Sequence, residues 1–345
     1  MTKLPLKSRR VWLLAPLLAG AHLIDEAAAA SNPAVPPLKL RSIADISLGG
    51  HPTRLDYASI DTARHLLFIA HLGDSEVIVF NTESKSVIAR IAKVSHVHGV
   101  LVIPELGRVY ASATGTNEVV AIDETTFNIT ARTPGGTYPD GIAYAPKAHK
   151  LYVSDEHGGT DTVIDVRSDA RVATIQIGGK IGNTQYDTAT GHVFVNAQSS
   201  AELVEIDPST DMIIRRMPVP KANGNHGLLI DSAQHRAFIA CEGNDTLIVM
   251  DLGTGTALAN FSVAKDPDVL ALDPGRQDLY VAGESGQVTA FKLTANSVSK
   301  AGESFVGPNA HVVAVDPNTH DIYFPIMNVD GKTVLRIMRS DSEHR

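Results

Sequence analysis

Short apolar segments alternate with polar turns from Tyr57 onward, and this pattern recurs about every 42 residues. Each copy contains a first apolar strand, a polar turn, a second strand with an aromatic residue, and a third strand that often ends in "ID" or "MD". A fourth segment alternates apolar and polar residues, as in "SVIARIA" and "RVATIQI". Such period-two alternation between turns predicts β-strands, and no segment shows a sustained helical period. The copies begin at Tyr57, Gly99, Gly141, Thr184, Gly227, Val269 and Val312.

Four strands in each of seven copies predict an all-β fold, a seven-bladed β-propeller of four-stranded blades. The last copy supplies only three strands before Arg345. We expect the segment "LKLRSIADISLGG" from Leu38 to add the fourth strand, so that the N-terminal strand closes the last blade and covers its edge. Residues 31–345 are therefore expected to form a single propeller domain without an internal linker.

Three copies resemble the YVTN-repeat (YncE-like) propeller family. They are "RLDYASIDTARHLLFIAHLGDSEVIVFNT" from Arg54, "YPDGIAYAPKAHKLYVSD" from Tyr138 and "DPDVLALDPGRQDLYVAG" from Asp266. The resemblance covers nearly all of the chain after residue 30 and implies the same seven-bladed fold. It implies little about function, because repeats rather than chemistry define the family. The sequence contains no WD dipeptide, so it does not resemble a WD40 propeller.

The first 30 residues have the composition of an export signal. Basic residues precede the apolar run "VWLLAPLLAGAHLI", and the small residues of "EAAAAS" offer a cleavage site before Ser31. The pair Arg9 and Arg10 in "SRRVWLL" also fits a twin-arginine signal, so Sec and twin-arginine export both remain open. We expect a periplasmic or secreted mature protein without a membrane span.

Charge and cysteine content narrow the classes of function. The formal net charge is −8, and no basic tract follows the first ten residues, so nucleic-acid binding is not expected to be the main role. The single cysteine, Cys241, excludes an internal disulfide and a CxxCH attachment site for covalent haem. The cofactor is left unknown, with a divalent metal as one option.

One position of the repeat carries most of the candidate chemistry. It precedes the first strand of each copy, which lines the central channel of a propeller, so its seven side chains are expected to meet at one mouth of the channel. Because the ring closes, each histidine at this position has an aspartate on a neighbouring blade. The position holds, in chain order, Asp56, His98, Asp140, Gly182, His226, Asp268 and His311.

A carboxylate beside an imidazole raises the imidazole pKa and orients the ring, as a general base or a metal ligand requires. We therefore take His98, His226, His311, Asp56, Asp140 and Asp268 as candidate catalytic residues. The three histidines are also candidate ligands of a divalent metal. The alternative is polar lining of a water-filled channel, and "PDG" around Asp140 is also ordinary turn chemistry.

Residues around this mouth are candidates for ligand binding. Arg54 is suited to an anionic group, and Asn183 stands beside Gly182. His71, Cys241 and Glu242 follow second strands of their copies, at the same face. For Cys241 the alternative is a small buried strand residue. Five other histidines recur at the turn before the second strand, on the opposite face, and are interpreted as turn residues: His65, His149, His192, His235 and His320.

Three functions remain open from the sequence. The first is an exported enzyme that performs metal-assisted or His/Asp acid–base hydrolysis or elimination, by analogy with propeller lactonases and lyases. The second is a non-catalytic module that presents the same mouth to a small molecule, a protein, a polymer or a metal ion. The third is a partner subunit of a redox system.

Overall fold

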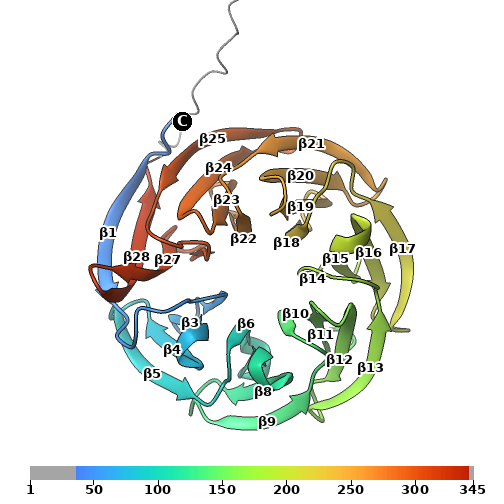
Figure 1. Cartoon of the computed structure of the whole chain (residues 1–345), viewed down its shortest axis with the longest axis horizontal. Coiled ribbons are helices and arrows are strands. Elements are labelled where there is room, and N and C mark those ends of the chain that lie inside the picture. The colour runs from blue at the N-terminus through green and yellow to red at the C-terminus, as the bar shows by residue number, and fades with distance from the viewer. Residues whose placement is uncertain (1–35, 342–345) are drawn as a thin grey trace, which may run out of the picture. The chain divides into compact units, whose positions relative to one another are not determined.

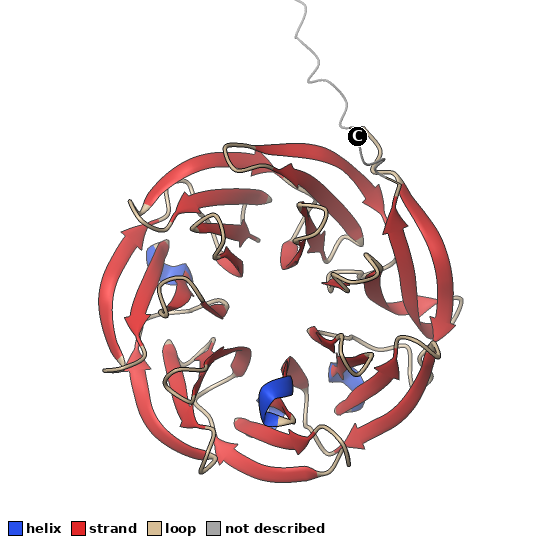
Figure 2. Cartoon of the chain, turned by 180° about the vertical axis from the view of Figure 1, so that it is seen from behind, coloured by secondary structure: helices blue, strands red, loops and turns tan. Residues whose placement is uncertain are grey.

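Seven four-stranded antiparallel sheets stand around a central axis, as predicted (Figure 1). The computed structural model describes residues 36–341. The predicted export signal, residues 1–30, lies outside them. Figure 2 shows the same ring from behind, built almost entirely of strands and loops. Within residues 36–341, no helix has the length and apolar character needed to cross a membrane.

The strands of the first four blades follow one another directly in the chain. Blade 1 consists of β2 (Ala58–Asp61), β3 (Leu66–His71), β4 (Glu76–Asn81) and β5 (Ser86–Ala92). Blade 2 consists of β6 (Val97–Ile103), β7 (Arg108–Ala113), β8 (Glu118–Asp123) and β9 (Ile129–Pro134). Blade 3 consists of β10 (Pro139–Ala145), β11 (Lys150–Asp155), β12 (Thr160–Asp165) and β13 (Ala170–Gln176). Blade 4 consists of β14 (Thr184–Tyr186), β15 (Val193–Ala197), β16 (Glu202–Asp207) and β17 (Met212–Pro218).

Three further blades complete the ring, and the seventh combines both ends of the described chain. Blade 5 consists of β18 (Asn225–Asp231), β19 (Arg236–Cys241), β20 (Thr246–Asp251) and β21 (Thr256–Ser262). Blade 6 consists of β22 (Pro267–Asp273), β23 (Asp278–Gly283), β24 (Gln287–Leu293) and β25 (Val298–Phe305). Blade 7 consists of β26 (Ala314–Val315), β27 (Ile322–Val329), β28 (Lys332–Ser340) and β1 (Leu40–Ser47). The antiparallel pairing of β1 with β28 confirms that the N-terminal strand closes the ring.

The hydrophobic pattern explains where each strand lies. Middle strands such as β3, "LLFIAH", are buried along their whole length, because both faces of a blade pack against neighbouring blades. The outer strands β5 and β17 alternate between exposed and partly buried positions, as their period-two sequences predict. The aromatic residue of each second strand is at most 2% exposed; these are Phe68, Tyr110, Tyr152, Phe194, Phe238, Tyr280 and Tyr323.

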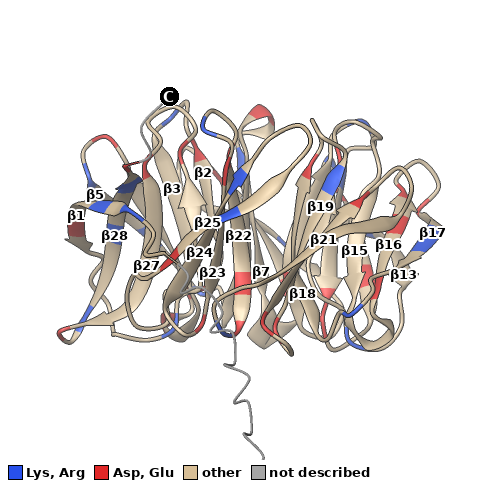
Figure 3. Ribbon diagram, turned by 90° about the horizontal axis from the view of Figure 1, so that it is seen from above, with Lys and Arg blue, Asp and Glu red and all other residues tan. Residues whose placement is uncertain are grey.

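The turn before the second strand and the turn after the third strand of the blades each require their polar residues for a structural reason. Four of the five repeated histidines, His65, His149, His235 and His320, have φ between 51° and 61° and so occupy left-handed turn positions. The side chains that end the third strands accept hydrogen bonds from backbone N–H groups of the next turn; these are Asn81, Asp123, Asp165, Asp207 and Asp251. From the side, many charged residues lie along the loops of the two faces (Figure 3).

Candidate functional site

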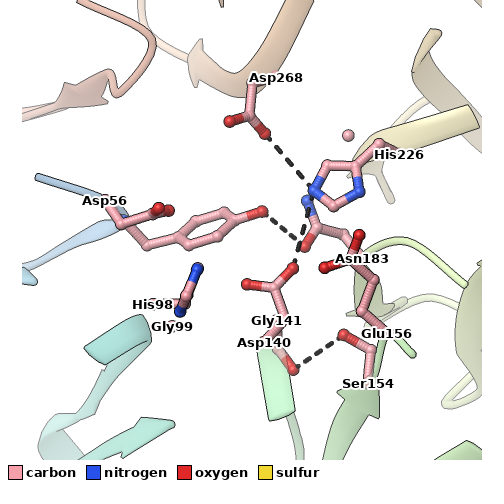
Figure 4. A network of polar contacts seen from close by, with 12 residues as sticks. Asp56, His98, Gly99, Asp140, Gly141, Ser154, Glu156, Asn183, His226 and Asp268 are labelled. Atoms are coloured by element: carbon pink, nitrogen blue, oxygen red, sulfur yellow. Dashed lines mark hydrogen bonds and ion pairs between the residues drawn. The ribbon is translucent and has the colours of Figure 1, made fainter. Parts of the chain in front are cut away.

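A cavity of about 570 Å³ opens at the mouth where the innermost strands begin, and we call it the mouth cavity. Its wall holds six carboxylates, from Asp56, Asp140, Glu156, Glu242, Asp268 and Glu284. Arg54, Tyr57, Tyr138, His96, His98 and His226 also line it. Five of the seven residues at the repeat position identified in the sequence therefore gather at one mouth, where acidic groups outnumber basic ones (Figure 4).

His226 lies between two aspartates (Figure 4). Its Nε2 is 3.7 Å from Oδ2 of Asp140 and 3.6 Å from Oδ1 of Asp268. The amide Nε2 of Gln198 lies 2.8 Å from Nδ1 of His226, so Nδ1 accepts a hydrogen bond and the ring N–H faces the two carboxylates. Burial lowers the pKa of His226, but Asp268 and Asp140 outweigh burial, and the net shift is upward.

Gly182 explains how His226 reaches an aspartate two blades away. The sequence predicted only the neighbour Asp268 for His226. A Cβ at Gly182, on the intervening blade, would lie 2.5 Å from the carbonyl oxygen of His226. Because this blade contributes no side chain at the ring position, His226 packs directly against its backbone and approaches Asp140 as well.

His311 lies behind the wall of the mouth cavity and is 1% exposed. Its Nδ1 donates a hydrogen bond to the carbonyl oxygen of Asn309, at 3.0 Å. Its Nε2 is 3.9 Å from Oδ2 of both Asp56 and Asp268, which are the two neighbours predicted from the ring. Burial lowers the pKa of His311, but Asp56 and Asp268 outweigh burial and raise it.

The surroundings shift the pKa values of the three aspartates at this repeat position in opposite directions. Burial acts to raise the pKa of Asp56, but His311, His98 and Arg54 overcome that effect and hold the pKa below its usual range. Burial raises the pKa of Asp140, and the surrounding carboxylates add to this although His226 opposes it. Burial also raises the pKa of Asp268. The three aspartates of one repeat position therefore differ in how readily they ionise, an arrangement common at functional sites.

His98 does not have the predicted partners. Its Nδ1 lies 3.0 Å from the carbonyl oxygen of His96 and 2.9 Å from Oγ1 of Thr114, and its Nε2 lies 3.1 Å from the hydroxyl of Tyr138. Within residues 36–341, no ion pair joins His98 to Asp56 or Asp140. Tyr138 takes that place, and its ring lies beside the imidazole.

The predicted three-histidine metal centre is not formed. Among residues 36–341, two sets of three potential ligands have their ligand atoms within 4.8 Å of one another. Of the three histidines predicted to bind the metal, only His311 belongs to either set. The sets are His71, Asp74 and Glu76, and Asp268, Glu284 and His311. His98 and His226 are held apart because each is fixed by its own partners.

Arg54 is already bound by carboxylates. Its Nε lies 3.2 Å from Asp56, its Nη1 2.6 Å from Glu284, and its Nη2 4.0 Å from Asp268. A guanidinium neutralised in this way is a weak anchor for an anion, so the role expected for Arg54 is not supported by its contacts.

Two predicted ligand-binding residues lie outside the mouth cavity. Cys241 is fully buried in a hydrophobic cluster with Ile239 and Ile248, and burial raises the pKa of its thiol to about 11. The structure therefore fits the alternative of a small buried strand residue, and Cys241 does not line the mouth cavity. His71 is also fully buried, with its ring nitrogens near Thr53 and Glu76.

Asn183 and Glu242, which were also predicted to bind a ligand, lie at or beside the mouth cavity. The Asn183 side chain accepts a hydrogen bond of 2.7 Å from the hydroxyl of Tyr57, which reaches it across the channel. This contact lies between the mouth cavity and a smaller cavity of about 160 Å³ further along the channel. Glu242 lines the mouth cavity and pairs with Lys180 at 3.4 Å.

Sequence reasoning missed Tyr57, Thr114, Tyr138 and Lys180. Lys180 also pairs with Glu156 at 2.8 Å and so joins two acidic walls. Tyr57 directly follows the ring residue Asp56, so its position could have been noticed. The register of the repeat also pointed to the other three. Thr114 occupies the repeat position of Glu242, and Tyr138 and Lys180 occupy that of Arg54.

Comparison with known proteins supports the resemblance and the fold. No family model matches the chain. A stretch of 102 residues is 31% identical to the uncharacterized protein YncE of Salmonella typhi and of Salmonella typhimurium. The chain is similar to YncE. This stretch is 30% of the chain and spans only 29% of the length of each YncE. It therefore supports the resemblance but says nothing about an activity.

Solved structures share the architecture at low identity. Hydrazine synthase of Kuenenia stuttgartiensis superposes with a TM-score of 0.72 and 13% identity, over 86% of this chain and 97% of that one. The WD40 repeats of RRP9 superpose with a TM-score of 0.73 and 11% identity, over 88% of this chain and 100% of that one. At such identities the likeness concerns the propeller fold alone.

Proposed function

We propose that the mouth cavity binds a small polar ligand and that the protein carries out this role after export. One observation supports the site most directly. Oδ1 of Asp140, Oδ1 of Asp268 and Nε2 of His311 are buried side-chain atoms that have no hydrogen-bond partner among residues 36–341. Buried polar groups are costly when they are unpaired. Because Asp140 and Asp268 line the mouth cavity and His311 lies directly behind its wall, these atoms favour a ligand that satisfies them.

The chemistry of the wall suggests which ligand fits. Six carboxylates line the mouth cavity, while Arg54 and Lys180 are each paired with two or more of them. Such a wall offers hydrogen-bond acceptors and negative charge, so a ligand with hydroxyl or amino groups suits it better than an anion. The volume of about 570 Å³ lies within the range of small-molecule sites.

Acid–base catalysis is a second candidate, favoured by the position of His226. Its Nε2–H faces Asp140 and Asp268, and Gln198 fixes the ring from the other side. An imidazole oriented in this way can donate a proton to a bound ligand and take one back. Hydrolysis or elimination on a hydroxylated substrate, such as a lactone, would use this group.

The ligand-binding proposal can be tested by thermal shift with a panel of polyols, amino sugars, amino acids, lactones and carboxylic acids. A ligand that binds only the folded state raises the melting temperature. We expect hits among hydroxylated and amino compounds, and loss of the shift in Asp140→Asn and His226→Gln. His149→Asn is the matched control, since His149 occupies an exposed turn on the opposite face. Shifts that persist in both site variants, or an entirely silent panel, would overturn the proposal.

Export is tested separately. We propose that residues 1–30 are removed on export, because they contain a basic segment, an apolar run and a small-residue cleavage site. Amino-terminal sequencing of the protein from a periplasmic fraction should then begin near Ser31. A chain that starts at Met1 and remains in the cytosolic fraction would contradict export without affecting the binding site.

A further inference from the structure

One wall of the mouth cavity gathers potential metal ligands in an arrangement that the repeat does not require. Ligand atoms of Asp268, Glu284 and His311 all lie within 4.8 Å of one another. Asp56 is outside this set of mutually close atoms, but its Oδ2 also lies 3.9 Å from Nε2 of His311, as Oδ2 of Asp268 does. One imidazole nitrogen therefore faces three carboxyl groups that come from blades 1 and 6.

The orientation of His311 points to a bound cation. A backbone carbonyl oxygen can only accept, so Nδ1 of His311 carries the hydrogen in its bond to Asn309. This bond fixes the ring and directs Nε2 toward the carboxylates, as a backbone carbonyl commonly does for a metal-binding histidine. Nε2 is buried and has no hydrogen-bond partner in the described part of the chain.

The distances are also suitable for an ion. A separation of 3.9 Å between Nε2 and each aspartate oxygen is too long for a hydrogen bond. Two ligands of one ion with bonds of about 2.0–2.4 Å lie roughly 3–4 Å apart, depending on the angle at the metal. The ligands would need only a small movement to enclose an ion.

Arg54 provides positive charge at this place in the present structure. Its guanidinium contacts Asp56, Glu284 and Asp268, the same carboxylates that face His311. The pairing is partly exposed, since the Arg54 side chain is 34% accessible. An ion that entered would compete with Arg54 for these oxygens.

We propose that Asp268, Glu284 and His311 bind a divalent first-row metal ion in the wall of the mouth cavity, with Asp56 as a further ligand after a small movement. The inference deepens the proposed function and rests on it, because the bound ion would present its open positions to the cavity where the ligand lies. One nitrogen and three carboxylates suit Mn²⁺ or Zn²⁺ better than Ca²⁺, which prefers oxygen ligands alone. The site differs from the three-histidine centre expected from the sequence, since it uses His311 without His98 or His226.

Mn²⁺ is the probe for the test, with the full-length protein first treated with a chelator. Electron paramagnetic resonance of free Mn²⁺ measures its affinity, and we expect one ion per chain. His311→Gln and Asp268→Asn should each weaken binding at least tenfold. Glu156→Gln is the matched control: it removes one carboxylate from another part of the same wall and should change the affinity less than twofold.

Arg54→Gln distinguishes this site from general attraction of cations to an acidic surface. Removal of the competing guanidinium should tighten Mn²⁺ binding severalfold, and the increase should disappear when Asp268→Asn is added. Equal affinity in the wild-type protein and Arg54→Gln would overturn the proposed competition.

Pulsed electron paramagnetic resonance of the wild-type protein does not depend on any variant folding correctly. Mn²⁺ bound at the site should show coupling to one imidazole nitrogen, and Ca²⁺ should not displace it at equal concentration. Failure to bind Mn²⁺, or binding without nitrogen coupling, would overturn the inference. The compound panel separates the two proposals. Compounds that bind to a protein that fails to bind Mn²⁺ support the ligand site and contradict the metal site, whereas Mn²⁺ binding with a silent panel supports the metal site and contradicts the ligand site.

Discussion

At the scale of single residues, one repeat position acquires different chemistry on each blade because its backbone is repeated while its side chain varies. His226 and His311 occupy equivalent positions, but the first lines the mouth cavity and the second is buried behind it. Gly182 is the exception that organises its surroundings, since its lack of a side chain lets His226 approach Asp140. The absence of a side chain at one ring position thus matters as much as the groups around it.

The substitution Gly182→Ala tests this role. The added Cβ would meet the carbonyl oxygen of His226 at 2.5 Å and its Cα at 2.7 Å, so the two inner strands must move apart. We expect a loss of about 1–3 kcal/mol in the free energy of unfolding, measured in urea, together with loss of ligand shifts. Gly253→Ala in an exposed turn is the control, where the nearest contact of a Cβ is 3.3 Å and the change should be small.

A second residue-scale prediction concerns Glu124, which is 1% exposed at the turn after β8. Burial and the nearby carboxyl of Asp61 raise the pKa of Glu124 to about 7. The folded state therefore holds this proton more tightly than the unfolded state does. Its contribution to stability is fully present below about pH 4.5 and is lost as the pH rises through about 7.

Glu124→Gln should remove this pH dependence. At pH 8 the variant is expected to be more stable than the wild-type protein by about 1–2 kcal/mol, and at pH 4.5 the two should be similar. Urea titrations at both pH values measure the difference. A variant that is less stable than the wild type at pH 8 would show that the ionised Glu124 is stabilised by its surroundings.

At the scale of elements, the blades were predictable from the sequence because each strand encodes its own burial. Continuous apolar runs became the middle strands, and alternating runs became the outer ones. The ring neighbours of His311 followed from the repeat register alone. The partners of His98 did not, because the repeat gives the position of Tyr138 but not the direction in which its side chain points toward the imidazole. The sequence left the burial of Cys241 open. A cysteine at the end of a strand can either line a cavity or pack in the hydrophobic core.

The closing strand gives the element-scale prediction. Leu48, just after β1, is 1% exposed and packs in a cluster that joins blade 7 to blade 1 through Leu335, Ile337 and Leu67. Leu48→Ala should lower the free energy of unfolding by about 2–4 kcal/mol, since it leaves a cavity at the ring closure. Ile88→Ala on outer strand β5, where Ile88 is 47% exposed, should cost much less. Similar losses in the two variants, measured by urea titration, would contradict a special role for this junction.

At the scale of the whole molecule, the candidate site exists only because the ring is closed. Its side chains come from blades 1, 2, 3, 5 and 6, and the 4.0 Å contact between Arg54 and Asp268 joins residues more than 200 positions apart in the chain. A ligand in the mouth cavity would therefore stabilise the closed ring as a unit. The sequence indicated which face of the ring carries the chemistry, whereas the acidic balance of the wall and the pairing of Arg54 emerged only from the assembled blades.

A crystal structure of the protein with the compound that gives the largest thermal shift tests the central claim most directly. We expect electron density for the compound in the mouth cavity, with hydroxyl or amino groups within hydrogen-bond distance of Asp140 or Asp268. Density on the outer strands or the opposite face, with the mouth cavity holding only water, would contradict it.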